Sequence, residues 1–103
     1  GADAETIKSI IQSDASLSQR VHPKYDYCIA EIVFSVRHEM AMTLEDILAR
    51  RTRLLLLDAQ AAIDAAPLVA RVMLPLLEED EKWEEEQLAS FLGLANGYLA
   101  AKS

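Results

Sequence analysis

Three closely spaced arginines are the side chains best suited to bind an anion. Arg50, Arg51 and Arg53 lie within four residues, and guanidinium groups match the planar geometry of phosphate and carboxylate oxygens. Residues 43–53 also form a predicted helix that comes directly after another one, and two consecutive helices joined by a short turn are the pattern of a helix-turn-helix. The competing interpretation is structural, because Asp46 and Arg50 are spaced to pair on one helix face and arginine suits a helix's last turn. We expect the three arginines to contact a neighbouring domain, a partner or their own helices, and not nucleic acid.

A run of acidic residues could suggest a calcium loop. It comprises Glu78, Glu79, Asp80, Glu81, Glu84, Glu85 and Glu86. The run lacks the alternating Asp/Asn ligands and the central glycine that such a loop requires. Acidic residues are favoured in the first turn of a helix, so the run predicts a solvated helix start.

The remaining candidates for metal binding or nucleophilic chemistry in the first half of the chain are His22, Cys28, His38 and Glu39. No two of His22, Cys28 and His38 have the spacing of metal ligands. Catalysis by Cys28 would need a positioned base, and a small apolar packing role suits this residue better. We therefore assign no catalytic, metal-binding or cofactor-binding residue within the chain.

Composition and charge limit the classes of protein to which the chain can belong. Its 103 residues are 51% hydrophobic and carry a net charge of −7, which describes one globular domain and a poor binder of nucleic acid. Residues 1–53 have a net charge of −1 and residues 54–103 of −6. The single cysteine, and the absence of any apolar run that approaches the roughly 18 to 20 residues a membrane span needs, predict a cytoplasmic location.

Helical spacing of apolar residues predicts the first two elements. The first helix begins after a cap at Asp3 and ends near Ser13, and a loop follows. Asp26 is a candidate cap for the second helix, whose apolar stripe runs through residues 29–40. Thr43 with Asp46 resembles a capping box that opens the third helix.

The second half of the chain predicts further helices. The leucines at 54–57 fit a fully buried helical turn better than a short strand. Asp58 can cap a helix over residues 59–65, and Pro67 can open the next one. Pro75 should kink or end that helix. In the last helix, capped by Asp80 and spanning about residues 81–101, Gly93 and Gly97 suggest a close helix crossing or a frayed end. The fold class is therefore all-α, a compact bundle of five to six helices forming a single domain over residues 1–103.

The stretch from Ala30 to Arg53 resembles the C-terminal helical domain of FAD-dependent glycerol-3-phosphate dehydrogenases and the related α-glycerophosphate oxidases. The residues that carry the resemblance are Ala30-Glu31, His38-Glu39, Glu45-Asp46, Arg50-Arg51-Thr52-Arg53, the alanine-rich 58–63, Pro67, Glu86 and Phe91. The resemblance covers nearly the whole chain. Pro75 departs from the family pattern and leaves the end of its helix open.

The resemblance implies an accessory (cap) domain of a larger flavoprotein, with no cofactor of its own. The parent would oxidise glycerol 3-phosphate to dihydroxyacetone phosphate with FAD and pass electrons to quinone or oxygen. Its FAD-binding domain would lie upstream in the same chain. The resemblance also allows a homo-oligomer and a parent peripheral to the cytoplasmic face of a membrane.

Two other functions remain as alternatives from the residues alone. One is a stand-alone helical protein-interaction module, and the other is a helix-turn-helix DNA binder, which the negative charge disfavours. A complete enzyme is the least supported of all, because the sequence offers no nucleophile–base pair, metal set or cofactor loop.

Overall fold

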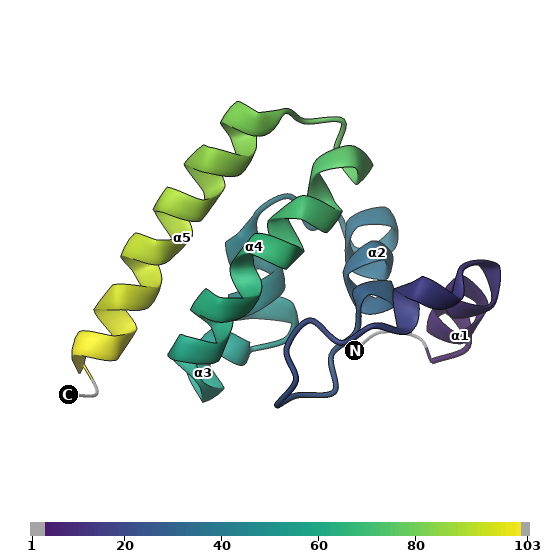
Figure 1. The fold of residues 1–103 in the computed structure, drawn as a ribbon, viewed down its shortest axis with the longest axis horizontal. Coiled ribbons are helices and arrows are strands. Elements are labelled where there is room, and N and C mark those ends of the chain that lie inside the picture. Colours follow the sequence, from purple (N-terminus) through teal and green to yellow (C-terminus); the bar gives the residue numbers. More distant parts are fainter. Residues whose placement is uncertain (1–3, 102–103) are drawn as a thin grey trace.

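Helix α4 (Ala59–Leu76) is the central element of the computed structural model, which describes residues 4–101. It contacts α2 (Ile29–His38), α3 (Leu54–Leu57) and α5 (Glu81–Ala101), as Figure 1 shows. Its buried side carries six alanines together with Val69 and Met73. Small side chains let neighbouring helices approach closely, so the alanine-rich sequence suits this central place.

The all-α fold expected from the sequence is confirmed. The described residues form five α-helices and two short helical segments, and they contain no strand. The short segments are η1 (Ala15–Ser18), a 3₁₀ turn, and η2 (Asp46–Arg51), which has π-helical geometry.

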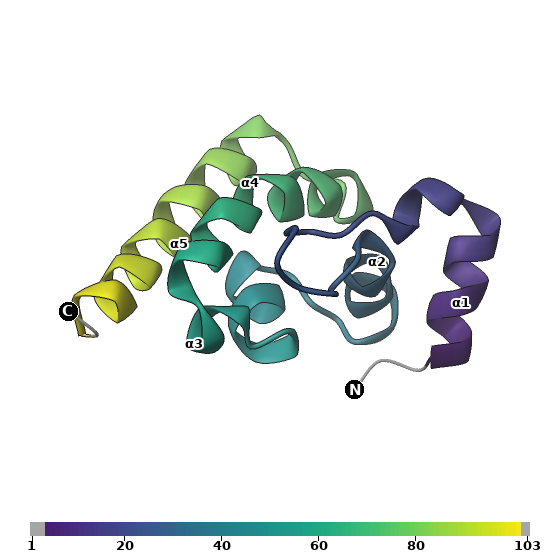
Figure 2. The ribbon, with the colours of Figure 1, turned by 60° about the horizontal axis from the view of Figure 1, so that its bottom comes forward.

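The N-terminal helix α1 (Ala4–Ser13) packs on α2 and η1 at one end of the molecule (Figure 2). The predicted end at Ser13 is confirmed, whereas the proposed cap Asp3 lies outside the described residues. After η1, residues 19–28 form a loop whose ends are joined by hydrogen bonds from Val21 N to Tyr27 O and from Ile29 N to Gln19 O, both 2.9 Å.

Two predictions about α2 are wrong. Asp26 does not cap the helix, because its carboxylate pairs with Arg20 at 3.0 Å. The cap is Cys28, whose N–H donates to the Glu31 carboxylate at 2.8 Å. The apolar stripe stops short of Met40, because the helix ends at His38 and Met40 adopts a left-handed φ of 59° with 81% of its surface exposed.

The Leu54–Leu57 turn is helical, as predicted, but it is only half buried. Leu54 and Leu55 are fully buried, whereas Leu56 and Leu57 are 40% and 62% exposed. A single helical turn points its side chains around the whole helix, so one turn against one neighbour buries only part of the run.

Helix α4 is longer than the sequence predicted. Residues 59–65 and the segment from Pro67 form one continuous helix. Pro67 lacks an N–H, so the carbonyl of Ile63 loses its usual donor. Pro67 is exposed, and on a solvated face water can replace that donor. Pro75 lies one residue before the end of α4 at Leu76, as predicted for a helix-ending proline.

By length and composition, α4 is the one described helix that could also cross a membrane. It packs against α2, α3 and α5, and a core helix of a globular protein has the same composition. This finding is therefore weak evidence for a membrane span.

Helix α5 has the predicted bounds, and its Asp80 carboxylate accepts from the Trp83 N–H at 3.0 Å as expected for a cap. The expected explanations of the two glycines are wrong. The helix runs on past Gly97 to Ala101, and a Cβ added to Gly93 or Gly97 would meet nothing within 4 Å. Each glycine costs about 1 kcal/mol relative to alanine inside a helix, and no close contact among the described residues accounts for it.

Candidate functional site

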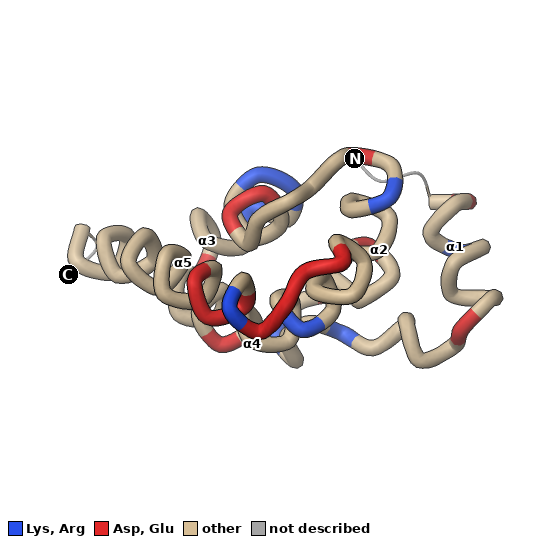
Figure 3. The backbone as a smooth tube through the Cα atoms, turned by 90° about the horizontal axis from the view of Figure 1, so that it is seen from above, with Lys and Arg blue, Asp and Glu red and all other residues tan. Residues whose placement is uncertain are grey.

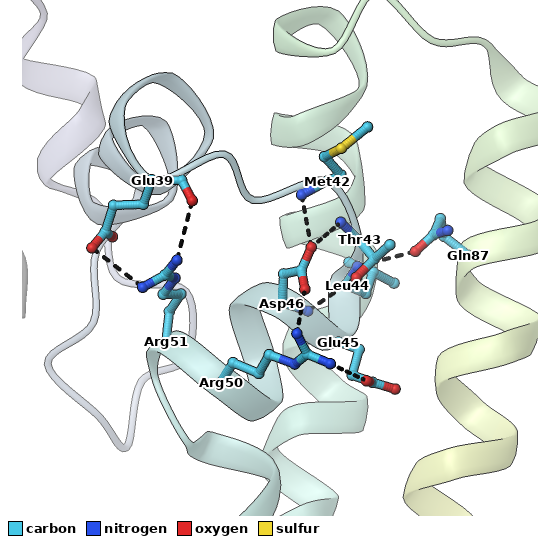
Figure 4. A network of polar contacts seen from close by, with 9 residues as sticks. All are labelled: Glu39, Met42, Thr43, Leu44, Glu45, Asp46, Arg50, Arg51 and Gln87. Carbon is cyan, nitrogen blue, oxygen red and sulfur yellow. Dashed lines mark hydrogen bonds and ion pairs between the residues drawn. The ribbon is translucent and has the colours of Figure 1, made fainter.

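The segment from Thr43 to Arg53 folds around two hydrogen-bonded caps. The backbone N–H of Asp46 donates to the Thr43 hydroxyl at 3.0 Å, and the Asp46 carboxylate accepts from the Thr43 N–H at 3.1 Å. The predicted capping box is thus confirmed, with Asp46 also accepting from the Met42 N–H at 2.9 Å. Gln87 of α5 accepts from the Leu44 N–H at 3.0 Å, which ties the start of this segment to α5 (Figure 4).

Thr52 joins η2 to α3. Its N–H and its hydroxyl both donate to the carbonyl of Ile47, each at 2.9 Å, and its hydroxyl oxygen accepts from the Leu54 N–H at 3.2 Å. The bond from Thr52 N spans five residues, which defines the wide π turn. The side chain of Thr52 is buried, so its hydroxyl satisfies backbone groups that water cannot reach.

The structure separates the three predicted arginines by their contacts. Arg50 faces the carboxylates of Glu45 and Asp46 at 3.7 and 3.8 Å, so the predicted Asp46–Arg50 pairing is observed as a loose pair. Arg51 donates to the Glu39 carbonyl at 3.1 Å and to its carboxylate at 3.4 Å (Figure 4). Two of the three guanidinium groups are therefore directed at the domain's own acidic residues.

Arg53 differs from the other two. Its backbone is left-handed with φ 57°, and its side chain is exposed. Within residues 4–101 its guanidinium group makes neither an ion pair nor a hydrogen bond. Non-glycine residues seldom adopt this conformation, so the fold orients Arg53 outward at a local energetic cost.

A cavity of about 170 Å³ opens between α2 and η2. One wall is a polar stripe of α2 formed by Glu31, Ser35 and Glu39, and the opposite wall holds Arg50 and Arg51. The Ser35 hydroxyl donates to the Glu39 carboxylate at 3.1 Å. Sequence reasoning missed Glu31 and Ser35 as parts of this site, although the spacing of four residues from Glu31 to Ser35 to Glu39 signals a shared helix face.

The other sequence candidates do not converge. The His22 side chain faces Asp64 at 3.7 Å, Cys28 lies at the start of α2, and the ring of His38 packs on Phe34 near its end. Across the described residues, no three His, Cys, Asp or Glu side chains are grouped as a metal site would need.

The acidic run forms the turn before α5 and its first turns. Asp80 caps the helix, and Glu84 pairs with Arg71 of α4 at 3.0 Å. Figure 3 shows this acidic stretch in red where α4 leads into α5. The run therefore stabilises a helix start and its packing on α4, in line with the interpretation from sequence.

Two carboxyl groups near these caps have lowered pKa values. Partial burial acts to raise the pKa of Asp46, but the N–H groups of Met42 and Thr43 hold that pKa below its usual value. The Ala61 N–H and the Tyr25 hydroxyl lower the pKa of Asp58, the cap of α4. Both charged forms are therefore tied to the native backbone.

Residues 4–101 do not form the turn that a flavin fingerprint requires. A flavin fingerprint places glycines in a tight turn between a strand and a helix. Gly93 and Gly97 lie inside α5, Gly1 is outside the described part, and residues 4–101 form no strand.

The family described as the C-terminal domain of alpha-glycerophosphate oxidase matches residues 1–87. The chain belongs to this family. Its relatives include a probable mitochondrial glycerol-3-phosphate dehydrogenase of Dictyostelium discoideum, 35% identical over 99 residues, which cover 96% of this chain and 15% of the relative. The similarly named protein of Caenorhabditis elegans is 34% identical over 90 residues, which cover 84% of this chain and 12% of the relative.

A third relative is the mitochondrial glycerol-3-phosphate dehydrogenase of Schizosaccharomyces pombe. It is 34% identical over 90 residues, which cover 84% of this chain and 13% of the relative. The chain thus spans 12–15% of the length of these three relatives. No solved structure matches the chain.

The comparisons confirm the resemblance inferred from sequence and assign the chain to the C-terminal domain of this dehydrogenase family. They overturn the expected cytoplasmic location, because these relatives are named mitochondrial proteins. Sequence composition could not have revealed the compartment, since nothing in a folded acidic domain distinguishes the two locations.

Proposed function

We propose that this chain is the non-catalytic C-terminal accessory domain of an FAD-dependent glycerol-3-phosphate dehydrogenase. The observation that carries the proposal is the family match over residues 1–87 together with coverage of only 12–15% of the relatives' length. The parent oxidises glycerol 3-phosphate to dihydroxyacetone phosphate on FAD and passes the electrons to a quinone. The names of the relatives favour a mitochondrial location for it.

In this proposal the flavin-bearing part of the same polypeptide packs against the η2 side of the domain. Arg53 supports this orientation. Its backbone is left-handed, its side chain is exposed, and its guanidinium group has no hydrogen-bond or ion-pair partner in the described part of the chain. Met40 and Met42, 81% and 61% exposed, lie on the loop that leads into η2. Exposed methionine and arginine are enriched at protein interfaces. Arg50 and Arg51, in contrast, hold the local fold.

A chimera tests the proposal. The matched segment of the Dictyostelium relative is replaced by this chain, and flavin content and glycerol 3-phosphate oxidation with a quinone analogue are measured. We expect a flavin-loaded, active enzyme, whereas the isolated chain should neither bind FAD nor turn over substrate. An inactive chimera that is folded and flavin-loaded would contradict the accessory role, as would turnover by the chain alone.

Variants of the chimera test the proposed contact. Arg53→Ala should loosen the domain from the flavoprotein part, which limited proteolysis would detect as faster release of the C-terminal segment. Lys82→Ala is the matched control, because Lys82 is an exposed cation in the first turn of α5. Equal release rates for both variants would exclude Arg53 from the contact.

A further inference from the structure

The cavity between α2 and η2 has an unused hydrogen-bond acceptor on its α2 wall. One oxygen of the half-buried Glu31 carboxylate accepts from the Cys28 N–H at 2.8 Å, and the other oxygen has no donor among residues 4–101. No cationic side chain in that range forms an ion pair with Glu31. Glu39, the other carboxylate that lines the cavity, is paired with Arg51 at 3.4 Å. Among the described residues, Glu31 is therefore the lining carboxylate whose charge lacks a cation.

The two arginines on the opposite wall do not neutralise this carboxylate, because each faces other acidic groups. Arg51 donates to Glu39, as Figure 4 shows. Arg50 lies 3.7 and 3.8 Å from the carboxylates of Glu45 and Asp46. A partly desolvated carboxylate without a cation carries a cost in free energy, and a nearby positive charge would reduce that cost. Charge complementarity therefore favours a cationic occupant of the cavity over an anionic one.

The size and lining of the cavity suit one long side chain. Its volume is about 170 Å³, and a cavity of about 150 Å³ can hold a group of the size of benzene. Its buried apolar lining residues are Val21, Ile32, Ile47, Leu48 and Val69. Lysine and arginine carry an apolar stem below a charged head. Such a side chain can lay its stem against the apolar lining and direct its head at the α2 carboxylate.

The cavity adjoins the surface that the proposed flavoprotein contact uses. Tyr27, one of its lining residues, donates its hydroxyl to the carbonyl of Thr52 at 2.6 Å, and Thr52 directly precedes Arg53. The loop that joins the two walls, α2 and η2, carries the exposed Met40 and Met42. The chain spans 12–15% of the length of three relatives, so under the proposed function most of the parent is available to fill the cavity.

We propose that a lysine or arginine side chain of the flavoprotein part enters the cavity between α2 and η2 and forms an ion pair with Glu31. This inference rests on the proposed function, and it adds to that function one contact residue and the charge of its partner. The net charge of −7 on this chain favours a partner surface of the same positive sign at longer range.

The variant Glu31→Gln of the chimera tests the proposal. A glutamine oxygen can still accept from the Cys28 N–H, so the cap of α2 is kept while the charge is lost. We expect limited proteolysis to release the C-terminal segment at least about threefold faster, because release follows the population of the undocked form. Glu81→Gln is the matched control and should leave the rate unchanged, since it removes an exposed first-turn carboxylate from another helix.

A soluble cation gives a second readout that a purely local role of Glu31 would not produce. n-Butylguanidinium at tens of millimolar, near the effective concentration of a tethered group, should compete for the cavity and speed release from the unchanged chimera but not from Glu31→Gln. Sodium chloride at equal concentration controls for ionic strength. Equal release rates for Glu31→Gln and Glu81→Gln would overturn the proposal even in an active chimera. So would an n-butylguanidinium effect that equals the effect of sodium chloride or survives Glu31→Gln.

The activity of the unchanged chimera separates this inference from the proposed function. An active, flavin-loaded chimera in which Glu31→Gln changes nothing would leave the proposed function standing and remove the ion pair. A flavin-loaded chimera without activity would contradict the proposed function, and the inference would fall with it.

Discussion

The guanidinium group of Arg51 bridges the carbonyl and the carboxylate of the same residue, Glu39. The two contacts measure 3.1 and 3.4 Å. Glu39 is the C-terminal cap of α2, where backbone carbonyls lack helical donors. Arg51, the last residue of η2, therefore supplies a hydrogen-bond donor to the carbonyl at the end of α2. This contact holds α2 and η2 together across the cavity between them.

Arg51→Ala should lower the free energy of unfolding by about 1 kcal/mol, because it removes hydrogen bonds from a side chain that is 43% exposed. The melting temperature of a domain of this size falls by about 4–8 °C per kcal/mol. Arg50→Ala is the control and should change it by less than about 0.5 kcal/mol, since its pairs are 3.7 and 3.8 Å long. Equal losses in thermal denaturation would show that the Arg51–Glu39 bridge has no special role.

Thr52→Val should lower the free energy of unfolding by about 1–3 kcal/mol, because it leaves the Leu54 N–H without its acceptor in a buried site. The shape of the side chain is nearly unchanged, so the loss reports the hydroxyl. Thr52→Ser keeps the hydroxyl and should recover most of the stability. Urea denaturation of both variants measures the difference, and similar midpoints would argue against a role for the hydroxyl in the joint between η2 and α3.

The hydrogen bond from the Tyr25 hydroxyl to the Asp58 carboxylate, 2.9 Å long, should make stability depend on pH at both extremes. The pKa of Asp58 is lowered, first by the Ala61 N–H, so its contribution is complete above its ordinary value near 3.8 and is lost as the pH falls through the lowered folded value.

The pKa of Tyr25 is raised above 10.0, mainly by the same hydrogen bond. The contribution of Tyr25 to stability is complete below its ordinary pKa and is lost as the pH rises through its pKa in the folded protein. Melting temperatures measured from pH 2 to 11 should decline at both ends. Tyr25→Phe should flatten the alkaline decline, and an unchanged alkaline profile would contradict this assignment.

Local signals in the sequence sufficed to predict three of the helical starts. Thr43, Asp58 and Asp80 each accept the backbone N–H that a capping residue should accept, because capping depends on neighbours two or three residues away. The cap predicted at Asp26 is wrong, because the helix begins only at Ile29 and the exposed Asp26 carboxylate pairs with Arg20 within the preceding loop.

Features that depend on tertiary packing could not be predicted. The continuous α4 through Pro67 depends on that residue facing solvent, and the exposure of Leu57 depends on how many neighbours surround α3. The arginines illustrate the same limit at the candidate site. Their spacing predicts the Asp46–Arg50 pair. The directions of the other two side chains, Arg51 toward Glu39 and Arg53 toward solvent, follow from the π geometry of η2, which no short sequence pattern specifies.

Gly93→Ala and Gly97→Ala should each raise the free energy of unfolding of the monomer by about 1 kcal/mol. Both glycines lie inside α5, and an added Cβ meets nothing within 4 Å, so the variants gain the helix propensity of alanine without a clash. Ala89→Gly, at an exposed position of the same helix, should lower stability by a similar amount. Denaturation at about 1 μM measures the monomer; destabilisation by either alanine would mean that a neighbouring backbone lies closer to α5 than the structure places it.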